Sequence, residues 1–173
     1  ERCGTAARER HLDMVAADLR RIEGADGEPL TNEAPPRLSA SDFLTGNPGI
    51  QGSNLFVRLS VLLAAGGFDE ALRSTTDRDL CIRIADLGPV RYGRVGAALV
   101  DHFAGPNRPR LSTRGSEAKL DGLTTFWQKY VGRMSGQQRR AFSDRAALLF
   151  GWRPPAEPAA PARAPTRGTA KTA

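Results

Sequence analysis

The residues best suited to chemistry in this chain are two carboxylates at the start of a predicted helix, in the string Asp77-Arg78-Asp79-Leu80. Free backbone N–H groups and the helix dipole stabilise an ionised carboxylate at a helix N-terminus. An ionised and directionally fixed carboxylate can take a proton from a hydroxyl group. Structural roles stay open for both residues, because Asp77 can be a plain helix N-cap and Asp79 can pair with Arg83 one turn later.

The elements that must position these carboxylates are predicted from the preceding residues. Residues 53–59 alternate in polarity and predict a short strand, and residues 60–65 predict a short helix. The string Gly66-Gly67-Phe68-Asp69-Glu70 then ends that helix and forms a turn. The next helix is predicted to start at Thr76 or Asp77 and to stop before Gly88-Pro89, with Leu80, Ile84 and Leu87 on its apolar side.

The rest of the chain gives a mixed pattern of strands and helices. Residues 11–22 are compatible with a helix or with a strand that enters a turn. Residues 1–10 are expected to be frayed and residues 28–40 to form a loop. Residues 90–92 and 97–103 are predicted strands, 105–117 a basic loop, and 120–129 and 137–150 helices, the second with Phe142, Ala146 and Leu149 at helical spacing.

Taken as a set, the strings at residues 52–58, 66–70 and 77–83 resemble the C-terminal half of the catalytic domain of family 2 glycosyltransferases. These enzymes commonly show a strand that ends in Arg, then Gly-Gly-Phe-Asp-Glu, then an acidic pair before Asp-Leu-x-x-Arg. The resemblance covers roughly residues 11–104. It implies an α/β fold, namely part of a Rossmann-like GT-A domain with a mixed sheet and helices. It also implies an inverting transfer of a sugar from a nucleotide-sugar donor to a glycan or another hydroxyl acceptor.

The resemblance also implies roles for individual residues. Asp77 matches the general base, although this family often has Glu where Thr76 precedes it. Gly67, Phe68, Asp69 and Glu70 would face the acceptor, with Asp79 beside them, and His102 would contribute a ligand to a divalent metal, Mg²⁺ or Mn²⁺. The nucleotide-binding strands and the Asp-x-Asp metal motif of the family precede the matching region. The chain is therefore expected to be the acceptor-side piece of a longer enzyme and to be inert alone.

Composition excludes several other classes of protein. The 173 residues hold two Cys and two His, too few for a disulfide framework or a His-rich metal cluster. The uninterrupted apolar runs are far shorter than the roughly 20 residues that cross a bilayer. The first residues resemble no signal peptide, so a cytoplasmic location is expected.

Charge and composition divide the chain into three expected regions. Residues 1–104 carry 12 basic and 15 acidic side chains and form the glycosyltransferase part. Residues 105–152 carry 9 basic and 3 acidic side chains and form a basic helical extension. Residues 153–173 hold five Pro and seven Ala without a large apolar residue, which predicts a disordered tail.

Two other functions remain open at this point. The basic extension could dock on nucleic acid or another anionic partner, with Phe126, Trp127 and Tyr130 as stacking groups. Their helical spacing favours packing against the body instead, and no known nucleic-acid motif is present, so a nucleic-acid partner is not expected. The second alternative is a scaffold that keeps the fold without catalysis. The residues upstream of residue 1 distinguish the two: an Asp-x-Asp motif there would indicate an active enzyme, and its absence would indicate a scaffold.

Overall fold

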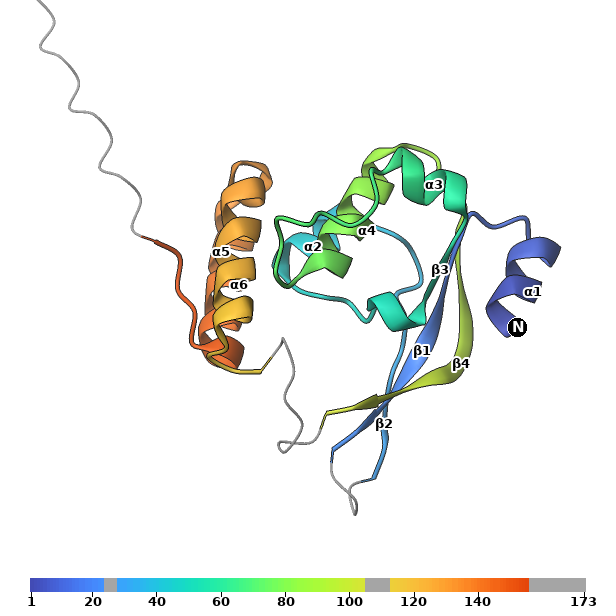
Figure 1. Ribbon diagram of the computed structural model, residues 1–173, viewed down its shortest axis with the longest axis horizontal. Helices are drawn as coiled ribbons and strands as arrows, with labels where there is room; N and C mark the ends of the chain where they lie inside the picture. The colour runs from blue at the N-terminus through green and yellow to red at the C-terminus, as the bar shows by residue number, and fades with distance from the viewer. Residues whose placement is uncertain (24–27, 105–112, 156–173) are drawn as a thin grey trace, which may run out of the picture.

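The computed structural model describes residues 1–23, 28–104 and 113–155, and in this part of the chain a mixed four-stranded sheet forms around strand β1 (Met14–Ile22) (Figure 1). The first six residues of β1 are all buried. A strand that is covered on both faces carries a continuous apolar run and does not need alternation. This burial resolves the ambiguity of residues 11–22 in favour of a strand.

The partners of β1 lie along both of its edges. Strands β2 (Leu30–Asn32) and β3 (Leu55–Val57) pair antiparallel with opposite ends of β1. Strand β4 (Tyr92–Phe103) runs parallel to β1 along its whole length. The predicted loop at 28–40 therefore contains a short strand. The predicted strands at 90–92 and 97–103 are replaced by one strand that begins only at Tyr92 and includes residues 93–96. Glycines within β4 made it look like two separate strands in the sequence. The pairing register shifts on both sides of Asp18, where β4 contains more residues than the facing part of β1.

Six helices occur in the described part of the chain. They are α1 (Arg2–Glu9), α2 (Ala40–Thr45), α3 (Leu59–Ala64), α4 (Thr76–Asp86), α5 (Glu117–Tyr130) and α6 (Gly136–Phe150), with 3₁₀ turns η1 (Gly52–Asn54) and η2 (Val131–Arg133). The prediction of a frayed start is wrong, because α1 packs against β1 and β4. The positive φ angles of Gly66 (80°) and Gly67 (68°) confirm the predicted stop after α3.

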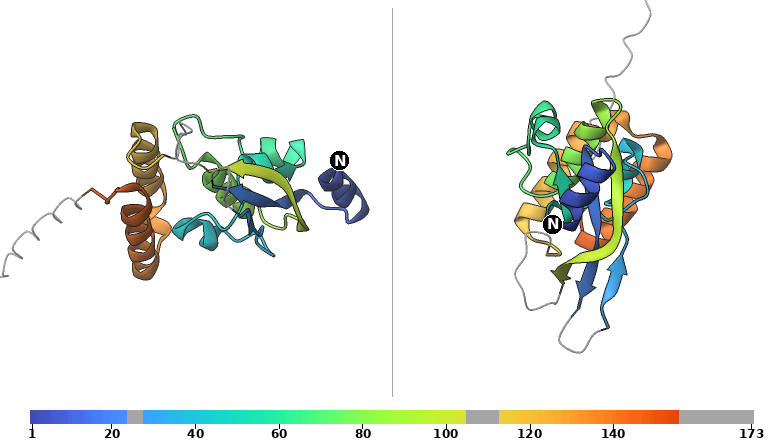
Figure 2. Two further views of the ribbon diagram at one scale, coloured as in Figure 1. Left: turned by 90° about the horizontal axis from the view of Figure 1, so that it is seen from below. Right: turned by 90° about the vertical axis from the view of Figure 1, so that its right-hand side faces the viewer.

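Helices α2 and α4 lie between the sheet and the α5–α6 pair (Figures 1 and 2). One hydrophobic cluster joins β1, α2 and α4 to the aromatic side chains of α5 and α6. Phe126, Trp127 and Tyr130 are buried in it, which confirms that they pack and do not form an exposed stacking surface. Two predicted core residues, Leu87 and Leu149, are 42% and 40% exposed because each lies at the end of its helix, beyond the contact with its neighbours.

The architecture confirms the α/β class at the level of a mixed open sheet with helices. None of the helices in residues 1–23, 28–104 and 113–155 has the length and apolarity that a bilayer crossing requires. The predicted disordered tail lies almost wholly outside the described residues, as does most of the predicted basic loop at 105–117.

Candidate functional site

Asp77 lies in the first turn of α4, where two groups hold its carboxylate. Oδ1 accepts a hydrogen bond of 3.0 Å from the backbone N–H of Arg78, and Oδ2 accepts one of 3.3 Å from the side-chain amide of Asn47. The N–H of Arg78 is one of the donors that a helix leaves without an internal partner. The predicted placement of a carboxylate at a helix N-terminus is therefore confirmed, and the side chain has a fixed direction.

The start of α4 is shaped by the approach of α5. Thr75 precedes the helix with φ 65°, a left-handed conformation that is strained for a β-branched residue. Gly122 on α5 allows this segment to lie very close, because a Cβ at position 122 would stand 2.2 Å from Oγ of Ser74. The hydroxyl of Thr75 donates to the carbonyl groups of Ser74 and Gly122. Contact with α5 thus fixes the backbone that carries Asp77.

Asp77 lines a cavity of about 700 Å³ whose wall comes from several distant segments. Three residues that the sequence singled out, Asp77, Phe68 and His102, meet there. The rest of the described lining comes from Asn47, Gln51, Gly52, Leu72, Arg73, Ser74, Thr75, Thr76, Arg78 and Lys119. This volume lies within the range of sites that hold small molecules.

Burial and neighbouring cations act in opposite directions on Asp77. Burial raises the pKa of its carboxyl above 3.8, while the Arg78 N–H and the charges of Lys119 and Arg78 oppose that rise. A carboxylate with a raised pKa is a stronger proton acceptor than an ordinary aspartate. The local environment therefore favours a basic carboxylate that the nearby cations help to keep ionised.

Lys119 is a site residue that the sequence did not reveal. Its side chain is 8% exposed, it lines the Asp77 cavity, and its Nζ lies 4.3 Å from the centre of the Phe150 ring. Burial, together with the charges of Arg78 and Arg145, lowers its pKa to about 8. In the sequence it is one of many basic residues in the C-terminal third, so nothing marked it as buried beside Asp77.

The side chain of Arg78 connects α4 to three other helices beside the Asp77 cavity. Its guanidinium donates to the carbonyl oxygens of Phe43, at 2.7 and 3.1 Å, and Leu44, at 3.3 Å, in the last turn of α2. It also lies 4.2 Å from the centre of the Phe126 ring on α5 and 5.3 Å from that of Phe142 on α6. Burial lowers its pKa to about 9, so it remains a cation at neutral pH.

Asp79 has no exposed surface, and three side chains contact its carboxylate. Arg83 pairs with it at 2.8 Å, as predicted, and Lys129 and the Tyr130 hydroxyl lie at 2.7 and 2.6 Å. The hydroxyl of Tyr130 has a raised pKa because of burial and this hydrogen bond. A fully buried carboxylate with these partners has a structural role in linking α4 to α5.

Two of the predicted acceptor-side residues belong to the same network as Asp79. The carbonyl oxygen of Gly67 accepts a hydrogen bond of 2.6 Å from Arg83, and Asp69 pairs with Lys129 at 2.6 Å. Hydrogen bonds from Lys129 and the Ala71 N–H lower the pKa of Asp69. Glu70 is exposed. Of residues 67–70, Phe68 is the one that lines the Asp77 cavity.

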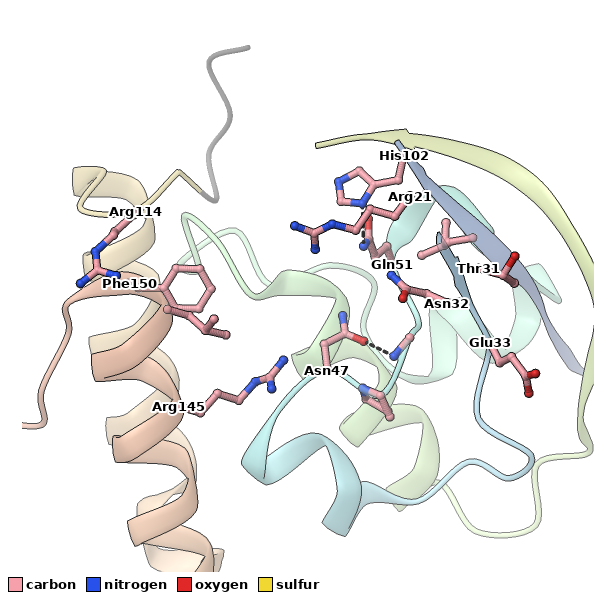
Figure 3. A pocket seen from close by; sticks show the side chains of 14 residues that line it. Arg21, Thr31, Asn32, Glu33, Asn47, Gln51, His102, Arg114, Arg145 and Phe150 are labelled. Carbon is pink, nitrogen blue, oxygen red and sulfur yellow. Dashed lines mark hydrogen bonds between the residues drawn. The ribbon is translucent and has the colours of Figure 1, made fainter. Parts of the chain in front are cut away.

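A second cavity, again of about 700 Å³, shares part of its wall with the first. Figure 3 shows the side chains that line this second cavity. Asn47, Gln51 and His102 line both cavities and form their common wall. Nδ1 of His102 lies 3.5 Å from the side-chain amide nitrogen of Gln51. Arg21, Arg114 and Arg145 also line the second cavity, which we call the arginine cavity.

The resemblance implies that His102 is a ligand to a divalent metal. Within the described residues, no three His, Cys, Asp or Glu side chains come together as a metal site would require. One neighbour of His102 is the Gln51 amide, which is a weaker ligand for Mg²⁺ or Mn²⁺ than a carboxylate. These residues do not hold a divalent metal by themselves, and His102 remains a predicted single ligand.

Comparison of the chain with protein-family models, with curated proteins and with solved structures returns no match in any of the three.

Proposed function

We propose that this chain is the acceptor-side part of an inverting family 2 glycosyltransferase with a GT-A fold, and that Asp77 is its general base. The main support is the shared cavity of Asp77, Phe68 and His102. The motif resemblance selects these residues from three separate segments, and they line one space of a size suited to a small ligand. A chance match of short strings does not require such convergence.

The proposed reaction is a single displacement at the anomeric carbon of the donor sugar. The acceptor hydroxyl oxygen forms the new bond to that carbon, and the bond from the carbon to the nucleotide diphosphate breaks. The electron pair of the broken bond leaves with the diphosphate, and the hydroxyl proton goes to the carboxylate of Asp77. A divalent metal, where present, would stabilise charge on the leaving diphosphate, and its main ligands would lie outside this chain.

The geometry of Asp77 suits this role in two respects. Its carboxylate is held at the start of α4 by Arg78 N–H and by Asn47, which fixes its direction. Its raised pKa favours transfer of the proton from a hydroxyl group. Phe68 would supply an apolar surface against which a sugar ring can pack.

The burial of three aromatic side chains counts against the alternative that the basic extension docks on nucleic acid. Its proposed stacking groups, Phe126, Trp127 and Tyr130, are at most 9% exposed, so a base cannot stack on them without disrupting the core. The scaffold alternative predicts the same fold without turnover, and an activity measurement separates it from the enzyme.

The test is sugar transfer by the protein produced from the complete reading frame that encodes this chain. Nucleotide-sugar donors are incubated with a panel of hydroxyl acceptors, and the product linkage is analysed by NMR. We expect transfer with inversion at the anomeric carbon. Retention of configuration, or an encoded protein without an upstream Asp-x-Asp motif and without turnover, would contradict the proposal.

A further inference from the structure

The arginine cavity is strongly positive. Arg21 from β1, Arg114 at the approach to α5 and Arg145 from α6 line it, and in Figure 3 the side chains of Arg21 and Arg145 extend into the space. The carboxylate among its described lining residues is Glu33, which pairs with Arg94 at 2.9 Å. Two guanidinium groups, those of Arg21 and Arg145, thus face the space from separate elements, while the guanidinium of Arg114 is directed away from it, toward the carbonyl oxygen of Leu148.

These guanidinium groups retain hydrogen-bonding capacity. Within residues 1–23, 28–104 and 113–155, Arg145 makes no hydrogen bond or ion pair. Arg114 donates to the carbonyl oxygen of Leu148 at 2.7 Å, and Arg21 pairs with the exposed Glu23 at 2.5 Å. A guanidinium group has five N–H donors in a planar fork. Most of these donors are therefore free for an anionic ligand.

The remaining lining suits a polar ligand with one apolar face. Thr31, Asn32 and Gln51 offer hydroxyl and amide groups, which can hydrogen-bond to sugar hydroxyls. Leu149 and Phe150 form an apolar side. Guanidinium groups bind carboxylate and phosphate oxygens in a bidentate way, so the arginines favour those anions.

We infer that the arginine cavity binds a phosphate or carboxylate group of the acceptor. The hydroxyl group of the same acceptor would then extend along Asn47, Gln51 and His102, which line both cavities, to Asp77. The identity of the ligand as an acceptor rests on the proposed function. The proposal thus narrows the acceptor to an anionic one, such as a sugar phosphate or a uronic acid. The diphosphate of a nucleotide-sugar donor has the same oxygen chemistry, so the experiment must separate the two sources.

The experiment is an NMR titration of the chain with four compounds: a hexose phosphate, a hexuronate, the corresponding neutral hexose and a nucleoside diphosphate. The side-chain amide signals of Asn47 and Gln51 report on the shared wall. The test variant is Arg145→Gln. Arg140→Gln is the matched control, because Arg140 is also exposed on α6 and its loss changes the net charge equally.

We expect the hexose phosphate and the hexuronate to shift the amide signals of Asn47 and Gln51, and the neutral hexose to bind more weakly. Arg145→Gln should weaken binding of the two anions about 10-fold, the scale of one charge-assisted hydrogen bond. Arg140→Gln should change the dissociation constant less than about twofold. In the complete enzyme, Arg145→Gln should raise KM for an anionic acceptor and leave KM for the donor unchanged.

Three results would overturn the inference. Equal weakening by Arg145→Gln and Arg140→Gln would mean diffuse attraction by the basic surface, as in binding to a polynucleotide. If Arg145→Gln weakened binding of the nucleoside diphosphate but not of the hexose phosphate or the hexuronate, the cavity would be a donor site. Equal affinity for neutral and anionic hexoses would show that no anion site exists. Absence of sugar transfer, with Arg145-dependent anion binding intact, would count against the proposed function and not against the anion site.

Discussion

Replacement of Asp77 by Asn tests the assignment of the general base, because it keeps the size of the side chain and removes its basicity. The Asn oxygen can still accept from the Arg78 N–H, which lies 3.0 Å from the present Oδ1. The new NH₂ group then faces the amide nitrogen of Asn47, 3.3 Å from the present Oδ2, where a donor meets a donor. Loss of one such hydrogen bond costs about 1 kcal/mol of the free energy of unfolding.

The expected effect on activity is much larger than the effect on stability. Loss of a general base lowers turnover roughly 10²–10⁴-fold, so kcat/KM of the complete protein should fall by that factor in Asp77→Asn. Burial raises the pKa of Asp77, so the wild-type rate should fall with decreasing pH through a value above 3.8, and the variant should lack this step. The assay combines urea unfolding of the chain with initial rates of transfer from pH 4 to 8.

Asp69→Asn and Asp79→Asn are the comparison variants. Asp69 pairs with Lys129 near the surface, so its replacement should leave both stability and turnover close to wild type. Asp79 is fully buried between Arg83, Lys129 and Tyr130, and its replacement should cost about 3–5 kcal/mol of stability. The base assignment fails if Asp77→Asn keeps most of its transferase activity while a folded Asp69→Asn or Asp79→Asn protein loses it.

Three further predictions concern stability. Gly122→Ala places a Cβ 2.2 Å from Oγ of Ser74 and should lower the free energy of unfolding, measured by urea titration, by about 1–3 kcal/mol. Gly132→Ala is the control: position 132 has open space around it, and its replacement should leave the free energy of unfolding nearly unchanged. The pKa of Lys119 is lowered to about 8, so the folded chain releases this proton before the unfolded one. Between pH 7 and 10.5 the wild-type chain should therefore gain on the order of 2 kcal/mol of stability relative to a Lys119→Met chain, and equal pH dependence of the two chains contradicts this. Trp152 is 5% exposed, and Trp152→Ala should cost about 3–5 kcal/mol, while removal of residues 153–173 should leave the melting temperature unchanged.

The local signals in the sequence predicted the elements around Asp77 well. The double glycine after α3, the start of α4 near Thr76 and the pairing of Asp79 with Arg83 are all present, because each depends on residues within a few positions of one another. The mixture of strands and helices followed from the same local patterns, whereas the α/β fold class was implied by the family resemblance.

Features that depend on distant contacts were not predicted. The left-handed Thr75 exists because Gly122 brings α5 close to it, 47 positions along the chain. The burial of Lys119 beside Asp77 and the convergence of Arg21 with Arg145 arise in the same way, since α5 and α6 cover parts of the molecule formed much earlier in the sequence. A basic residue gives no local sign of which other segment it will face.

The buried guanidinium of Arg78 has a mechanical consequence for the two cavities. It binds the end of α2 and lies against aromatic rings of α5 and α6, so one side chain of α4 connects four helices. Swinging the α5–α6 pair away from α2 would remove the Phe126 and Phe142 rings from this cation and leave only its hydrogen bonds to α2, a loss of about 2 kcal/mol for cation–π contacts formed away from water. Lys119 and Arg145 should therefore move with Asp77 as parts of one rigid body. A ligand would meet a preorganised wall here, and any hinged closure over it would have to come from a different segment.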